Sequence, residues 1–311
     1  MSVLSPLDER FPNSELYFVT KEEFSSLVLL HPKVKKVFSF NKQEGIFGLI
    51  RFALALRKEK FDIVYDAHSN VRSGILRLIL KPFSRSLFIQ RPKERIKRIL
   101  LFWFRVNKFP KPFRGMRSYL SPLKCLDVAQ KPINLSINAS FDLKKWVPFD
   151  KFIILAPSAA WELKRWPLEY WKNLIELCPM EKFVILGGPN DTFCMDLQNI
   201  DPSRCLSLAG SLSFTESTYI VSKADLVISG DTGIIHVADL LGIKGIALIG
   251  PSAFGHPTGD YIKVLERPLE CRPCTKDGRG KCTNPEFKKC LVDIKPKEVA
   301  YLASSLATKR S

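Results

Sequence analysis

The chain has 311 residues, which is enough for two α/β domains of about 150 residues with a core in each. Hydrophobic residues make up 46% and the mean hydropathy is near zero; no apolar run reaches the ~18 residues of a membrane span, and the N-terminus has no signal-peptide pattern, so we expect a cytoplasmic protein. The 48 Lys and Arg residues against 31 Asp and Glu residues give a net charge of +17, which predicts an anionic partner: nucleic acid, a membrane surface or a phosphorylated substrate.

Short β-forming runs alternate with helical periods in the first half. Strands are predicted at 16–19, 34–40 and 61–66, and helices at 21–30 and 46–58. Polar residues at 67–70 follow the third strand, at the end where an α/β sheet usually keeps its ligand groups. Ordinary Asn and Ser turn chemistry is the alternative interpretation of these residues.

The excess charge is concentrated between residues 81 and 117, where twelve basic residues stand against one acidic residue, Glu94. Within this segment, residues 95–107 combine basic and apolar positions and predict a helix. Such a helix suits a membrane interface, or it packs its apolar stripe on its own core. The segment lacks nucleic-acid-binding signatures, so we expect no nucleic acid partner. The residues predicted to contact an anionic acceptor or membrane are Arg91, Arg95, Arg98 and Arg105.

The second half repeats the alternation of strands and helices after a predicted domain boundary near Asp150, which divides the chain into 1–149 and 150–311. Strands are predicted at 152–156, 183–186 and 205–208, a helix opens at Pro167, and Ser213 with Glu216 forms a capping box for a helix that runs to Lys223. This order predicts a parallel, doubly wound sheet with ligands at the carboxyl ends of its strands.

The most informative stretch is 226–251, where an apolar strand ends in a turn, Gly230–Asp231–Thr232–Gly233, and continues as a helix and a further strand. The N-terminus of that helix presents free N–H groups and a positive dipole end, which suit a phosphate. Asp231 or Thr232 is expected to cap the helix, and His236 lies one turn inside it. There the helix N-terminus is expected to favour its neutral form. An ordinary βαβ turn is the alternative.

Several motifs in one order resemble glycosyltransferase family 9, the ADP-heptose:lipopolysaccharide heptosyltransferases. The D-T-G-x-x-H-x-A block at 231–238 is the most specific of them, and the G-P-S that follows the next strand also matches. The remaining matches are K-R-W-P at 164–167, G-G-P at 187–189, the F-D…N-x-R-S pattern at 61–73 and the cysteine-containing tail. The resemblance implies a GT-B-like α/β fold with two Rossmann-like doubly wound domains facing a cleft.

The resemblance also implies a function. The first domain would bind the acceptor and the second a nucleotide sugar, and a heptose would pass from ADP-heptose to the lipopolysaccharide inner core with inversion and without a metal. The sequence has no D-x-D motif to carry one. Residues that the motifs assign to the donor are Lys164, Asp231, Thr232, Gly233 and His236.

Three departures from the family pattern stand out. Gly230 replaces a frequent Asn, and Asp239 replaces a small apolar residue, which we interpret as variation on the outer side of the helix. The family also opens with a strand and an L-G-D loop whose Asp is the implied catalytic base, and this chain begins after that point. We therefore expect either a shortened or misassigned start or an impaired enzyme. Of the residues present, Asp66 and His68 are the candidate bases.

Two other classes of function stay open at this stage. One is a catalytically impaired family member that binds a nucleotide sugar or a lipopolysaccharide precursor, and the other is a basic nucleic-acid-binding α/β protein.

Four cysteines near the C-terminus have the spacing C-x2-C-x7-C-x7-C, which resembles a structural zinc site. Reduced thiols that close a loop are an equal alternative, and disulfides are disfavoured in a reducing compartment. The residues are Cys271, Cys274, Cys282 and Cys290.

Overall fold

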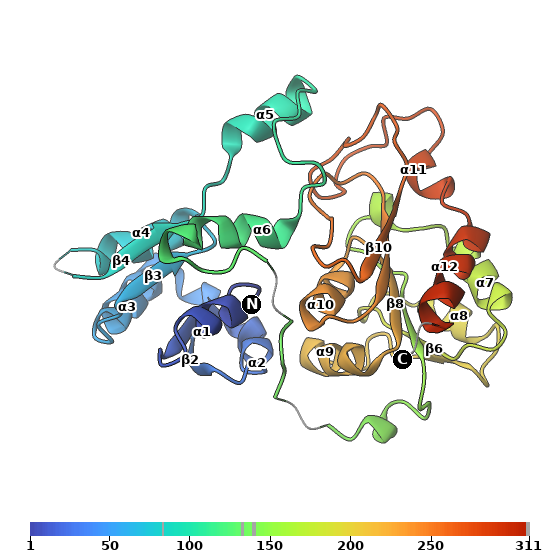
Figure 1. Cartoon of the computed structure of the whole chain (residues 1–311), viewed down its shortest axis with the longest axis horizontal. Helices are drawn as coiled ribbons and strands as arrows, with labels where there is room; N and C mark the ends of the chain where they lie inside the picture. The colour runs from blue at the N-terminus through green and yellow to red at the C-terminus, as the bar shows by residue number, and fades with distance from the viewer. Residues whose placement is uncertain (83, 132–133, 139–140, 309–311) are drawn as a thin grey trace. The chain divides into compact units, whose positions relative to one another are not determined.

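The computed structural model describes residues 1–82, 84–131, 134–138 and 141–308 (Figure 1). The chain divides into two compact units: Met1–Ile99 with Met116–Ile133, and Leu100–Gly115 with Asn134–Ser311. The division falls earlier in the chain than Asp150 because the connecting segment already packs in the second unit. The Leu135 N–H donates to the Leu240 carbonyl at 2.7 Å.

A six-stranded parallel sheet forms the centre of the second unit. Its strands are β5 (Ile153–Ala156), β6 (Phe183–Ile185), β7 (Cys205–Ser207), β8 (Leu226–Gly230), β9 (Gly245–Ile249) and β10 (Ile262–Glu266). Their spatial order is β10-β9-β8-β5-β6-β7. Counted from β5, this is the 3-2-1-4-5-6 order of a doubly wound nucleotide-binding sheet. The predicted sheet class is confirmed, and the order reverses between β5 and β8.

Helices cover both faces of this sheet, and its central strands β5, β8 and β9 are buried at every position. On one face of the sheet, side chains such as Ile153 and Ile228 pack with Trp171 and Val299. On the opposite face, side chains such as Ile154 belong to a second cluster of buried residues. The helices are α7 (Leu168–Leu177), α8 (Cys194–Gln198), α9 (Phe214–Lys223), α10 (Gly233–Leu241), α11 (Lys289–Val292) and α12 (Pro296–Thr308), with 3-10 turns η4 (Leu143–Lys145) and η5 (Glu162–Lys164).

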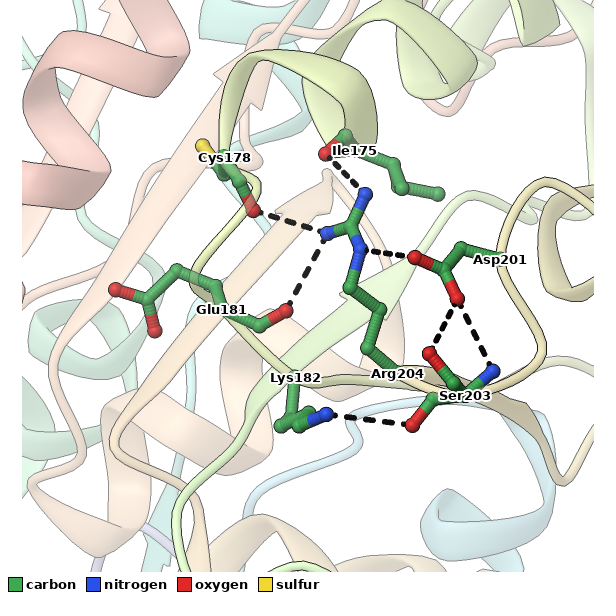
Figure 2. Close-up of polar contacts among 7 residues, drawn as sticks. All are labelled: Ile175, Cys178, Glu181, Lys182, Asp201, Ser203 and Arg204. Atoms are coloured by element: carbon green, nitrogen blue, oxygen red, sulfur yellow. Dashed lines mark hydrogen bonds and ion pairs between the residues drawn. The ribbon is translucent and has the colours of Figure 1, made fainter.

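Two helix ends in this unit have distinct side-chain caps. The predicted capping box of α9 is present: the Ser213 hydroxyl accepts the Glu216 N–H at 3.2 Å, and the Ser213 N–H donates to the Glu216 carboxylate at 2.7 Å. At the C-terminal end of α7, the Arg204 guanidinium donates to the carbonyls of Ile175 (3.1 Å) and Cys178 (3.0 Å) (Figure 2). A positive charge there suits the negative end of the helix dipole.

The first unit alternates short parallel strands with helices. Its strands pair as β1 (Leu16–Lys21) with β2 (Val34–Phe40) and β3 (Ile63–Asp66) with β4 (Leu87–Gln90). Other elements of this part of the chain are α1 (Leu4–Arg10), η1 (Glu22–Phe24), α2 (Ser25–Val28), η2 (Lys42–Glu44), α3 (Gly45–Arg57), α4 (Val71–Leu80), α5 (Arg95–Trp103), α6 (Gly115–Leu120) and η3 (Ser121–Leu126). Across the described ranges, no helix has the length and apolar character needed to cross a membrane.

Candidate functional site

The carboxyl ends of β5 and β8 lie side by side where the strand order reverses, with Ala156 opposite Ser229. In doubly wound sheets, ligands bind at this position. The loop after β5 carries Lys164 and the turn after β8 carries Asp231, and the Lys164 Nζ lies 2.9 Å from the Asp231 carboxylate. Two residues that the sequence assigned separately to one site therefore meet as an ion pair.

The Asp231 carboxylate has three partners. Besides Lys164, the Ser252 hydroxyl donates to Oδ2 at 2.6 Å and the His236 Nε2 lies 3.2 Å from Oδ1. Burial alone would raise the pKa of Asp231, but the hydrogen bond from His236 and the charge of Lys164 outweigh it and hold the pKa well below the usual range. The carboxylate is therefore ionised and fully engaged, and it fixes the Lys164 ammonium and the His236 ring.

Two glycines make this close packing possible. A Cβ atom on Gly255 would overlap the Asp231 carboxylate, so the backbone of this loop covers the ion pair directly. A Cβ atom on Gly230 would lie 3.0 Å from the Lys164 carbonyl oxygen. The approach of the Lys164 loop to the end of β8 leaves little room for a side chain at position 230.

The stem of Lys164 is enclosed by the C-terminal loop. Gly278 has a left-handed φ of +95°, and a Cβ atom there would lie 2.7 Å from the Lys164 Cγ and Cδ atoms. Trp161 lies beside the same glycine and carries the Arg279 guanidinium 4.8 Å above its ring. The Lys164 side chain is only 16% exposed, so its ammonium has one preferred position.

The N-terminus of α10 differs from the expected cap. Thr232 is the N-cap residue but makes no side-chain cap bond, because its hydroxyl lies 2.8 Å from the Ser229 hydroxyl. Asp231, the other expected cap, is occupied by its three partners. Among the described residues, neither Thr232 nor Asp231 therefore caps the first N–H groups of this helix, which begins at Gly233.

The turn after β6 contributes residues that sequence reasoning missed. The Asp191 carboxylate accepts the Gly188 N–H at 2.7 Å and the Ser158 hydroxyl, and Arg165 lies 3.7 Å away. Ser158 and Asp191 each follow the end of a predicted strand, and this position was the only sequence signal that could have identified them. Neither residue belongs to a distinctive motif. Ser252 was noted only as part of the G-P-S motif and was not assigned to the site, because it is close to Asp231 only in the folded chain.

Asp239 corrects the sequence analysis. It was predicted on the outer side of the helix, but it is 2% exposed and accepts the N–H groups of Thr258 (2.8 Å) and Gly259 (2.7 Å). Burial raises the pKa of Asp239, and the two N–H groups oppose that rise. The loop after β9 folds back over α10, so this carboxylate anchors the loop.

The two candidate bases of the first unit have different environments. The Asp66 Oδ1 accepts the N–H groups of His68 (3.0 Å) and Ser69 (2.7 Å), while its Oδ2 is buried and, among the described residues, has no hydrogen-bond partner. The His68 side chain is exposed. The alternative of turn chemistry holds for Asn70, whose side chain caps α4 in a capping box with Ser73.

The four predicted acceptor arginines do not form one cluster. Arg91 stacks on the Tyr119 ring at 3.7 Å and donates to the Ser118 hydroxyl at 2.8 Å. Burial, together with the charge of Arg91, lowers the pKa of Arg98, so these two guanidinium groups are neighbours. Arg95 is exposed, and Arg105 donates to the Pro273 carbonyl within the second unit at 2.8 Å.

The predicted zinc site is not formed by the described residues, among which no three His, Cys, Asp or Glu side chains are arranged to hold a metal ion. Cys271, Cys274, Cys282 and Cys290 are free thiols. Asn284 donates to the Cys271 sulfur at 3.6 Å, and burial raises the pKa of the Cys290 thiol to about 11. The alternative of reduced thiols in a closed loop stays a prediction.

Comparison with known proteins confirms the family resemblance. The model of the family described as glycosyltransferase family 9 (heptosyltransferase) matches residues 49–282. Lipooligosaccharide heptosyltransferase 2 of Campylobacter jejuni is 23% identical, over 98% of this chain and 93% of that protein. Two solved structures share the fold: a family 9 glycosyl transferase of Veillonella parvula (TM-score 0.76, 20% identity, 99% and 93% of the two chains) and ADP-heptose lps heptosyltransferase II of E. coli (0.73, 16%, 99% and 94%).

Proposed function

We propose that this chain, which belongs to glycosyltransferase family 9 and is therefore a glycosyltransferase, transfers a heptose from ADP-heptose to the inner core of lipopolysaccharide. The names of the Campylobacter and E. coli proteins support the choice of sugar and pathway. The single observation that carries the proposal is the Lys164–Asp231 ion pair at the reversal of the strand order. In this proposal residues 150–311 bind the nucleotide sugar and residues 1–149 bind the acceptor.

The donor diphosphate is expected to lie against the Lys164 ammonium and the N-terminus of α10, at Thr232 and Gly233. Both groups offer positive charge or N–H donors, and a helix N-terminus that lacks a side-chain cap suits an anion. Asp231 itself is an anion, so it repels phosphate and acts by positioning Lys164 and His236. His236 is then oriented towards the sugar end of the donor.

Inverting transfer needs a leaving diphosphate and a deprotonated acceptor hydroxyl. The acceptor oxygen attacks the anomeric carbon, the bond from that carbon to the phosphate oxygen breaks, and the hydroxyl proton passes to a base. Lys164 and the helix N–H groups stabilise the charge that develops on the diphosphate, which is the role that a divalent cation fills in other transferases. A metal-independent reaction is therefore the proposed one.

Asp66 is the better candidate for the base, with His68 as the second. The Asp66 carboxylate is held by two backbone N–H groups through Oδ1, while Oδ2 is buried and has no hydrogen-bond partner among the described residues. In this proposal Oδ2 accepts the proton only after acceptor binding opens the turn that covers it. If Asp66 is the base, Asp66→Asn abolishes transfer and His68→Asn retains it.

The acceptor and the membrane are proposed to contact the basic segment. On α5 the apolar side chains Ile96 (75% exposed) and Trp103 (82% exposed) lie in solvent, and Arg95 is exposed beside them. An exposed apolar stripe with adjacent cations suits the headgroup region of an anionic bilayer. The enzyme would then work at the inner face of the cytoplasmic membrane, with the exposed Arg95 as the proposed contact of the anionic surface.

The test is turnover of ADP-heptose with a heptose-deficient lipopolysaccharide acceptor, measured as ADP release and acceptor mass. The wild-type chain should transfer heptose, Lys164→Gln should be slower by about 100-fold, and Lys297→Gln, a matched change on α12, should be unaffected. No turnover by the wild type, or normal turnover by Lys164→Gln, would contradict the proposal. ADP binding without turnover would favour the impaired binding protein instead.

A further inference from the structure

The second unit contains a cavity of about 920 Å³ that the donor site does not use. Its walls come from residues 107–114, from strand β10 and from the loops that follow β9 and β10. Cavities of roughly 300–1,000 Å³ are typical of small-molecule sites. All of the lining residues belong to one compact unit, so the cavity is a property of that unit alone.

One wall of the cavity is formed by the segment Leu100–Gly115. Leu100–Gly115 is flanked in sequence by the first unit but packs in the second. Phe109 and Phe113 contact Phe254 with ring centroids 5.2 and 4.8 Å apart, and Arg114 donates to the Thr258 carbonyl. The segment Leu100–Gly115 therefore contributes aromatic rings to one wall of the cavity.

The lining is cationic at its edge. Five cationic side chains line the cavity against two carboxylates. Lys111 and Lys263 are both exposed, and among the residues that the structure describes they make no ion pair. Two unpaired ammonium groups at the edge of a cavity favour an anionic ligand.

One carboxylate in the cavity retains a free acceptor. His256 (3.1 Å) and Arg272 (2.9 Å) both contact the Oε2 atom of Glu266, and Oε1 has no partner within the described ranges. The hydrogen bond from His256 holds the pKa of Glu266 at about 2, so the carboxylate is ionised. An ionised carboxylate beside aromatic rings suits the hydroxyl groups of a sugar.

The cavity adjoins the donor cluster through Ser252. This residue lines the cavity and also donates its hydroxyl to Asp231 at 2.6 Å. We propose that the cavity is a second ligand site that binds a sugar carrying a phosphate or carboxylate group, with its anionic group at Lys111 and Lys263 and its hydroxyls at Glu266. That this ligand is the sugar end of the acceptor rests on the proposed function and extends the acceptor contacts from residues 1–149 to residues 252–273.

The experiment measures dissociation constants by NMR titration of the full chain with glucose 6-phosphate, glucuronic acid, glucose and inorganic phosphate. One or both anionic sugars should bind about tenfold more tightly than glucose and than phosphate, with shifts in residues 107–114 and 252–267. Lys111→Glu with Lys263→Glu should weaken this binding about tenfold. The matched pair Lys151→Glu with Lys297→Glu, which lies outside the lining, should not.

A second variant distinguishes the binding of the sugar hydroxyls from the binding of the anionic group. Glu266→Gln should weaken the sugar phosphate while leaving inorganic phosphate unchanged. The proposal would be overturned if neither anionic sugar bound, or if glucose or inorganic phosphate bound as tightly as glucose 6-phosphate. An equal loss of binding in the two charge-reversal pairs would also overturn it. ADP affinity measured in the same proteins reports on the donor site separately: its absence would contradict the proposed function, not the cavity site.

Discussion

At the scale of single residues, Asp231 acts through its neighbours. We expect Asp231→Asn to free Lys164 and His236, to weaken ADP binding about tenfold and to destabilise the fold by about 3 kcal/mol, since it leaves a mostly buried ammonium without its counter-charge. Calorimetric ADP titration and urea unfolding measure the two effects. Asp150→Asn, an exposed carboxylate of the same unit, is the control. An unchanged ADP affinity would show that Asp231 does not position Lys164.

Glu266 predicts a pH dependence of stability. Its pKa is about 2 in the folded protein against an ordinary 4.5, because the hydrogen bond from His256 stabilises the charged form. A depressed pKa contributes stability that is present above the unfolded value and is lost as the pH falls through the folded value. The difference in unfolding free energy between wild type and Glu266→Gln should therefore be present at about pH 5 and shrink towards about pH 2.

Urea unfolding at several pH values measures that difference. Glu270→Gln, at a solvent-exposed position, is the control. A difference that stays constant down to about pH 3 would contradict the assignment of the stabilising bond to ionised Glu266.

At the scale of elements, Arg204 holds the end of α7 (Figure 2). Arg204→Ala removes charge-assisted bonds to the carbonyls of Ile175 and Cys178 and should cost about 2 to 3 kcal/mol of unfolding free energy. Arg204→Lys keeps the charge without the planar fork and should recover only part of the loss. Urea unfolding is the measurement, and a loss below about 0.5 kcal/mol for the alanine variant would rule out this role.

The exposed stripe of α5 predicts binding to anionic vesicles. Trp103→Ser should weaken binding to phosphatidylglycerol vesicles about tenfold, because it removes the most exposed aromatic side chain of the helix. Met180→Ser changes an apolar residue that is 90% exposed elsewhere and should leave binding unchanged. Co-sedimentation measures both variants. Equal binding to neutral phosphatidylcholine vesicles would contradict the role given to the adjacent cations.

Sequence patterns gave good predictions for elements with local signals. The Ser213–Glu216 capping box and the strands around the D-T-G turn depend on neighbouring residues, so periodicity and cap chemistry located them. The helix predicted over 95–107 ends at Trp103, and Arg105 is left-handed with φ of 59°. The helix ends in a local backbone cap, in which the Val106 N–H donates to the Leu100 carbonyl at 2.9 Å across the left-handed Arg105. The periodicity of the side chains alone does not locate this end.

At the scale of the whole molecule, the doubly wound sheet was predictable because buried parallel strands are apolar on both faces. The membership of Leu100–Gly115 in the second unit was not, since it depends on contacts such as Phe113 with Phe254 across a long sequence separation. Asp239 shows the same limit: its carboxylate is buried only because a loop some twenty residues later returns over it. Motifs thus located the residues of the candidate site around Asp231, while the supporting contacts depend on the tertiary fold.

The most direct test of the central claim is hydrogen–deuterium exchange of the full chain with and without ADP. If the donor binds where the strand order reverses, ADP should slow exchange in the turn and first helical residues at 231–236 and in the Lys164 loop at 158–165, while α12 (Pro296–Thr308) stays unchanged. Protection confined to other parts of the chain, or no protection at saturating ADP, would contradict the claim.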